Sequence, residues 1–167
     1  AQTLTGLART LQRDGESANI TKDVYFETLQ TYSNSHRRVN EDGKTVCWID
    51  ENLNPFTGDW ISRTMLLAID YKYKERGKDY NHSSFCDLVI SGLVGVQPQA
   101  DGSIVIEPLI PEGEWDWFSL SRIPCAGKEI SVIYDRTGEH YGCKPGLTVY
   151  VDGKKTAHSE TYSTSIT

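Results

Sequence analysis

Residues 84–106, SFCDLVISGLVGVQPQADGSIVI, contain the point where the spacing of apolar residues changes. Up to Gly95 the apolar residues are spaced as in a helix that is apolar almost all round. From the IVI triplet at Ile104 onward the period is 2, which is typical of β-strands. This change predicts an all-helical half up to about Gly95 and an antiparallel β half after it.

Three more helices are expected upstream. The first is indicated by an apolar face that ends near Asp14, and because the chain opens inside this pattern, we expect residues to precede Ala1. The second begins at Thr21, a good N-cap, and ends near Arg38. A third, weaker pattern follows Asp59 and ends at Gly77. The first two faces are formed by Leu4, Leu7, Ala8 and Leu11, and by Tyr25, Leu29, Tyr32 and His36.

Residues 40–58 have no helical period and contain turn signals, so we expect a long ordered loop there. Loops of this length within a compact domain are often functional. Downstream, short alternating segments separated by turns, the clearest being Asp152-Gly153, predict a small antiparallel sandwich. The expected fold class is therefore α+β, with domains 1–97 and 98–167.

Composition excludes several classes of protein. The 167 residues carry a net charge of −6, and the basic groups at Arg37-Arg38 and in residues 72–78 are interleaved with acidic or polar residues, so no nucleic-acid partner is expected. No apolar run reaches the roughly 20 residues that span a bilayer, so we expect no membrane partner. The four cysteines and four histidines lack the spacing of a zinc site, so we expect no metal and no cofactor. We expect the cysteines to be buried or half-buried free thiols, and the alternative is a disulfide between two of them.

The loop after Cys47 concentrates chemically useful residues. Asp50, Glu51 and Asp59 lie between Trp48 and Trp60. Sugars stack on indole rings, and cleavage of their acetal bonds needs carboxylates as acid and base. In the alternative interpretation the carboxylates only solvate and cap, and the tryptophans belong to the core.

A second cluster, residues 80–84, directly precedes the apolar helix. Asn81 and His82 would lie at the electropositive start of this helix, where they could bind sugar hydroxyls. The structural alternative is that Ser84 caps the helix, Asn81 forms an Asx-turn and His82 is a satisfied core histidine.

The loop sequence DENLNPFTG, which begins at Asp50, resembles the E-N/Y-x-N/D-P-x-T-G segment of the glycosidase clan that contains trehalases, processing α-glucosidases and mannosylglycerate hydrolases. Residues 79–95 resemble the last barrel helix of the bacterial mannosylglycerate-hydrolase-like group. Residues from Ile106 onward resemble the C-terminal sandwich of that group. The resemblance covers nearly the whole chain.

This resemblance implies a fold and a mechanism. Residues 1–97 would be the last helices of an α/α toroid barrel, followed by the sandwich. Glu51 would be the general base of an inverting glycoside hydrolase, while Asn81 and His82 would lie near the sugar. Leu53 departs from the pattern, because many relatives have an aromatic residue there. The general acid of the family lies far upstream of the base, so none is assigned in this chain.

The expected function is therefore hydrolysis of a glycosidic bond by the parent enzyme, with a carbohydrate as substrate. Glu51 is the catalytic candidate, and Trp48, Trp60, Asn81 and His82 are the substrate-binding candidates. The missing N-terminal part of the barrel, or another chain, is the expected partner. The alternative is a non-catalytic structural or carbohydrate-binding fragment, in which Trp115 and Trp117 would be exposed, coplanar sugar platforms rather than core.

Overall fold

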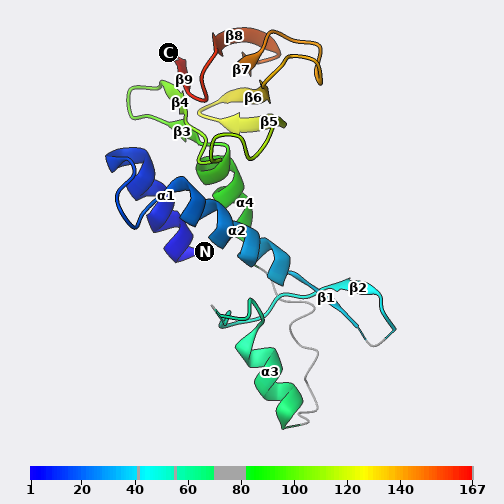
Figure 1. Ribbon diagram of the computed structural model, residues 1–167. Coiled ribbons are helices and arrows are strands. Elements are labelled where there is room, and N and C mark those ends of the chain that lie inside the picture. The colour runs from blue at the N-terminus through cyan, green and yellow to red at the C-terminus, as the bar shows by residue number, and fades with distance from the viewer. Residues whose placement is uncertain (41, 55, 70–81, 167) are drawn as a thin grey trace. The chain divides into compact units, whose positions relative to one another are not determined.

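The computed structural model describes residues 1–40, 42–54, 56–69 and 82–166. They form two compact units, whose elements are labelled in Figure 1. The loop unit comprises Ala1 and Glu27–Phe85, and the sheet unit comprises Gln2–Phe26 and Cys86–Thr167. These units group the residues differently from the expected domains, and the assignment of domains 1–97 and 98–167 stays a prediction.

Helices α1 (Gln2–Asp14) and α2 (Lys22–Ser35) form where the apolar spacing predicts them. The Thr21 hydroxyl accepts the backbone N–H of Val24 at 3.2 Å, which confirms Thr21 as the N-cap of α2. The apolar face of α1 is buried in the sheet unit through Leu4, Ala8 and Leu11.

The helix predicted from Ser84 consists of α4 (Phe85–Asp87) and a π-helical segment, Leu88–Leu93. Within the sheet unit, the Tyr25 hydroxyl donates to the Leu88 carbonyl at 2.7 Å, and the tyrosine lies against Gly92. A π-helical turn is wider than an α-helical one, and a glycine leaves room for the ring. The α-helical prediction is wrong over these six residues, because one wide turn leaves no apolar period of its own.

Beyond Gly95 the chain forms two antiparallel sheets, with strand orders β3-β4-β9 and β5-β6-β7-β8. The predicted change of period is confirmed, and helices followed by antiparallel sheets confirm the α+β class with a sandwich-like C-terminal part. The strands are β3 (Val96–Pro98), β4 (Ile104–Ile106), β5 (Trp117–Cys125), β6 (Lys128–Asp135), β7 (Gly146–Val151), β8 (Lys154–Ser159) and β9 (Thr164–Ile166).

The four-stranded sheet has one apolar face and one mixed face, as expected of a sheet with one side in a core. On the mixed face Trp117 pairs with Asp135, and Thr148 pairs with His158. The predicted turn at Asp152-Gly153 joins β7 to β8. The apolar face is buried through Phe118, Ile130, Val132, Tyr134, Leu147 and Val149.

One prediction about the first half is wrong. A two-stranded hairpin, β1 (Arg37–Val39) and β2 (Thr45–Cys47), lies in the part expected to be helical or irregular. Its turn is built locally, since the Asn40 side chain accepts the backbone N–H of Lys44 at 2.9 Å and Gly43 has a φ of 77°. Strands of three residues are too short to show a period of 2 in the sequence.

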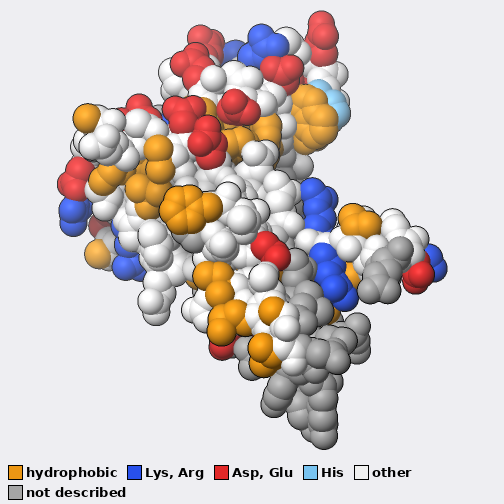
Figure 2. All heavy atoms as spheres, turned by 60° about the horizontal axis from the view of Figure 1, so that its bottom comes forward, with side chains coloured by type: hydrophobic (Ala, Val, Ile, Leu, Met, Phe, Trp, Pro, Cys, Tyr) orange, Lys and Arg blue, Asp and Glu red, His pale blue; other side chains and the backbone are white. Residues whose placement is uncertain are grey.

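Helix α3 (Ile61–Ala68) follows Asp59 as predicted. It carries exposed apolar side chains, and Figure 2 shows hydrophobic side chains gathered on this helix. The helix end predicted at Gly77 lies outside the described residues. In the described ranges no helix combines the length and apolar character needed to cross a bilayer.

Candidate functional site

Glu51 lies on the loop after β2, residues 48–60, which we call the Glu51 loop. Its side chain is exposed. Its backbone is held on both sides, because the Glu51 N–H donates to Asp50 Oδ1 at 2.9 Å and the Glu51 carbonyl accepts the Ser62 hydroxyl at 2.9 Å. A carboxylate that is open to solvent on a fixed backbone can accept a proton from a bound water.

The two other carboxylates of the loop have structural surroundings. Asp50 is fully buried and accepts the N–H of its neighbour Glu51. Asp59 is half-buried, and its Oδ2 accepts the Thr64 hydroxyl of α3 at 3.1 Å. Of the three carboxylates between the tryptophans, Glu51 is therefore the exposed one.

Trp48 and Trp60 are buried, with 2% and 3% of their surface exposed. The Trp60 indole N–H donates to the Ser35 carbonyl at 2.8 Å, and the Arg38 guanidinium lies 4.2 Å from the Trp48 ring centroid. A sugar needs an exposed ring face, and neither indole presents one here. Their placement matches the core interpretation, and sugar contact by either indole stays a prediction.

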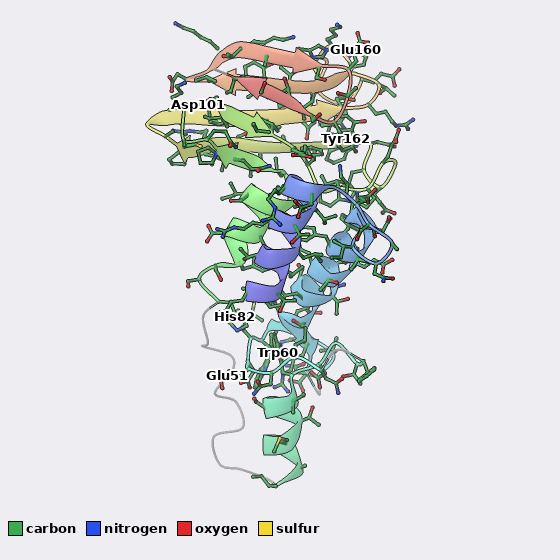
Figure 3. All side chains as sticks on the ribbon, turned by 90° about the vertical axis from the view of Figure 1, so that its left-hand side faces the viewer. Glu51, Trp60, His82, Asp101, Glu160 and Tyr162 are labelled. Carbon is green, nitrogen blue, oxygen red and sulfur yellow. The ribbon has the colours of Figure 1, made fainter. Side chains whose placement is uncertain are left out.

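His82 lies in a cluster of aromatic rings within the loop unit. The Tyr32 hydroxyl is 2.6 Å from His82 Nδ1, and the ring centroids of Trp60 and His36 lie 5.4 and 5.8 Å from that of His82. Figure 3 shows Glu51, Trp60 and His82 in the same part of this unit. Asn81, the other predicted sugar contact on this segment, lies outside the described residues.

The surroundings of both histidines of the cluster lower their pKa values, which favours the neutral rings. Burial lowers the pKa of His36 below its usual value, and the proximity of His82 lowers it further. Burial also lowers the pKa of His82, against the opposing effect of a backbone hydrogen bond to Asp50 and the charges of Asp50 and Glu51.

These shifts predict a loss of stability in acid. A histidine with a lowered pKa in the fold takes up its proton more readily when unfolded, so the stability it contributes is complete above about pH 6.5 and falls as the pH drops. We expect site-resolved NMR titration to give pKa values below about 6.5 for His36 and His82, and the loop unit to melt more easily at pH 5.5 than at pH 7.5. A pKa at or above 6.5 for both rings would contradict this.

Trp115 and Trp117 differ in their surroundings. Trp115 is 37% exposed and is therefore not a core residue, but it packs edge-on against Phe26 of α2, with centroids 5.6 Å apart, as expected of a tryptophan at an interface with a helix. Trp117 is 49% exposed and stacks on exposed His140, with centroids 3.7 Å apart and planes 3° apart. The two tryptophans therefore have different neighbours, and Trp117 has the larger exposed fraction.

The described residues contain no group of His, Cys, Asp and Glu that could hold a metal ion. Cys47, Cys86, Cys125 and Cys143 are free, but Cys47 and Cys86 are exposed, whereas buried or half-buried thiols were expected.

Sequence reasoning missed the connection between α2 and this loop. The apolar spacing places Tyr32 and His36 on one helix face, yet their rings lie against His82, and the His36 carbonyl accepts the backbone N–H of Trp48 at 2.7 Å. A tyrosine and a histidine four residues apart, at the end of a helix directly before a carboxylate-bearing loop, are the signal that could have indicated it.

Comparison with known proteins identifies what the chain resembles. Residues 99–158 match the family described as glycosyl hydrolase family 65, C-terminal domain. A solved structure named Sialidase is similar over 98% of this chain, with 33% sequence identity and a TM-score of 0.77. This chain spans 14% of the length of that protein. The similarity confirms a resemblance to the C-terminal part of a glycoside hydrolase.

Proposed function

We propose that this chain is a segment of a larger inverting glycoside hydrolase and that Glu51 is its general base. The observation that carries the proposal is the Glu51 loop, where an exposed carboxylate stands on a backbone held by Asp50 and Ser62. The match of residues 99–158 to a glycosyl hydrolase domain supports the same class of parent.

An inverting enzyme needs two carboxyl groups about 6.5–9.5 Å apart, so that a water fits between the base and the sugar. Glu51 would deprotonate this water on the face opposite the leaving group. The general acid comes from a part of the parent outside this chain. The 167 residues alone are therefore not expected to turn over substrate.

The remainder of the parent, or another chain, is the proposed partner of α3. The apolar side chains of Ile61, Met65 and Ile69 are spaced by four residues and are 37%, 63% and 70% exposed. An exposed apolar stripe of this kind is typical of a surface that another helix covers. This is the arrangement that an α/α toroid barrel requires.

The test of the proposal is the rate of glycoside hydrolysis by the full-length parent with Glu51→Gln. A normal kcat in this variant would remove Glu51 from the mechanism.

A second candidate function, carbohydrate binding by the sheet unit, is favoured by Trp117. His140 stacks on one face of this indole and Tyr141 packs edge-on against it with centroids 6.1 Å apart, yet Trp117 remains 49% exposed. The loop that carries His140 is also firmly built, since the buried Asp135 carboxylate accepts the backbone N–H groups of Gly138 and Tyr141, each at 2.8 Å.

We expect Trp117→Ala to weaken binding of a neutral oligosaccharide such as maltotriose by about tenfold, the typical effect of truncating an aromatic anchor. Trp117→Phe keeps a ring and should recover part of the affinity. NMR titration that follows the Trp117 indole N–H measures this directly. If the indole signal does not move at saturating sugar, the sheet unit has no such site.

A further inference from the structure

The backbone that carries Glu51 is paired with the start of α3. Residues 51–54 run antiparallel to residues 59–62, and each residue of one segment is paired with one of the other. The outermost pair joins the Ser62 hydroxyl to the Glu51 carbonyl at 2.9 Å. The other pairs are the Asn52 carbonyl with the Ile61 N–H at 2.8 Å, a β-bridge between Leu53 and Trp60, and the Asn54 N–H with the Asp59 carbonyl at 2.7 Å. The start of α3 therefore sets the path of the chain at Glu51.

Trp60, within this pairing, is bonded to the end of α2. Its indole N–H donates at 2.8 Å to the carbonyl of Ser35, the last residue of α2. The last carbonyls of a helix have no partner within the helix, so a donor from elsewhere can satisfy them. The Trp48 N–H does the same for the next carbonyl, that of His36, at 2.7 Å. The two tryptophans of the Glu51 loop thus bind two consecutive carbonyls at the end of one helix.

The Trp60 ring has little freedom to leave this position. It is 3% exposed, and the ring centroids of Tyr32, His36 and His82 lie 6.4, 6.4 and 5.4 Å from its own. The His36 ring lies parallel to the indole within 5°. A buried ring enclosed by other rings has few rotamers available, so its N–H holds the Ser35 carbonyl in a fixed geometry.

The geometry points to Trp60 and Ser62 as positioning residues that fix the general base, Glu51, through the start of α3. Trp60 attaches the start of α3 to α2, and Ser62 holds the Glu51 carbonyl. In this role the Trp60 indole acts inside the protein rather than on a sugar. The inference rests on the proposed function of Glu51. Displacing a catalytic group by about 1 Å can lower a rate by about 10²-fold, so such contacts matter to turnover although they touch no substrate.

The first test removes one hydrogen bond at a time in the full-length parent. Ser62→Ala loses the bond to the Glu51 carbonyl, whereas Ser62→Thr keeps the hydroxyl. Trp60→Phe keeps an aromatic ring and loses the N–H. We expect Ser62→Ala and Trp60→Phe to lower kcat by about 10–100-fold with little change in KM, and Ser62→Thr to keep most of the parental rate.

A second measurement reports on the loop without activity. The Asn54 and Ile61 amides make two of the bonds between the paired segments, so their hydrogen exchange should accelerate in Ser62→Ala and Trp60→Phe and stay near the parental rate in Ser62→Thr. Ser33→Ala is the matched control, because it removes an exposed hydroxyl from α2 in the same unit. It should leave both kcat and exchange unchanged.

A double variant separates positioning from a general loss of structure. In the Glu51→Gln background, Trp60→Phe should lower kcat little further, because a residue that acts through Glu51 has no effect once the base is absent. A tryptophan that only supports the fold would lower kcat by the same factor in both backgrounds. If Trp60→Phe does not fold, Ser62→Ala takes its place in the same comparison.

The outcomes separate the two proposals. Unchanged kcat and exchange in both Ser62→Ala and Trp60→Phe would overturn the positioning role, and so would equal losses of kcat in the two backgrounds. A raised KM with parental kcat in Trp60→Phe would overturn it in favour of sugar contact. If Glu51→Gln keeps its activity, the proposed function fails, and the exchange data alone decide whether Trp60 and Ser62 fix the loop.

Discussion

Glu51→Gln in the full-length parent is expected to lower kcat by about 10²–10⁴-fold, the usual contribution of a positioned general base. Glutamine preserves the size of the side chain and its hydrogen bonding but cannot accept a proton. Because the Glu51 carboxylate is exposed while its backbone is held by Asp50 and Ser62, the fold and sugar binding should change little. Steady-state kinetics and a thermal melt of the same preparation measure both.

The control must be a carboxylate of the same unit that has no structural role. Asp50→Asn is unsuitable, because Asp50 is fully buried and bonds to the backbone of Glu51. Asp42→Asn is better matched, since Asp42 is exposed in the turn between β1 and β2. It should keep the parental kcat.

Rescue adds a second criterion for the Glu51 role. Azide or formate can stand in for a missing base, so either should restore part of the activity of Glu51→Gln, which a purely structural glutamate would not permit. Parental kcat in Glu51→Gln together with inactivity of Asp59→Asn would transfer the role to Asp59. Full activity in both would leave the loop as scaffolding.

The sequence predicted the regular elements with long apolar patterns. The apolar faces that contain Leu4 and Tyr25 predicted α1 and α2, and the alternation around Ile130 and Leu147 predicted β6 and β7. These elements are predictable because an element with one buried face has apolar residues at a regular period. The hairpin of β1 and β2 and the π-helical segment were missed. Both are too short to leave a period of their own. The hairpin depends on the local contact of Asn40 with Lys44, and the π-helical segment is contacted by Tyr25, which is far away in the sequence.

For the candidate site, the sequence predicted which residues are involved but not which of them are exposed or in contact with one another. The loop sequence indicated Glu51, and the structure leaves it exposed. The same pattern offered Trp48 and Trp60 as sugar contacts, yet both are buried, because whether an indole faces solvent depends on residues far away in the sequence. The bond between Tyr32 and His82 joins residues 50 positions apart, and no spacing rule reaches that far.

Gly95→Ala should strongly destabilise the sheet unit. Gly95 has a φ of 74°, a conformation that costs a residue with a Cβ about 1–2 kcal/mol. A methyl group there would also overlap the backbone carbonyl of Glu107, and overpacking of this kind costs about 1–3 kcal/mol. The free energy of unfolding should therefore fall by about 2–5 kcal/mol.

The overlap cannot be relieved cheaply, because the backbone on both sides is fixed. The Gly95 carbonyl accepts the Glu107 N–H at 3.0 Å, and the next pair in register, Val96 and Ile106, is buried between β3 and β4. Separating the strands to admit a methyl group would break this hydrogen bond and open the packing around both side chains. The substitution is therefore expected to destabilise the junction between the helical segment that ends before Gly95 and the strands β3 and β4.

Gly113→Ala is the matched control for Gly95→Ala. Gly113 has a similar φ of 86°, but a Cβ there meets no atom within 4 Å. It should lose only the conformational part, about 1–2 kcal/mol, so the difference between the two variants measures the overlap with Glu107. Urea unfolding followed by circular dichroism gives both values. Equal losses in the two variants would mean that β3 and β4 move apart freely, and that the junction at Gly95 is not the fixed point described above.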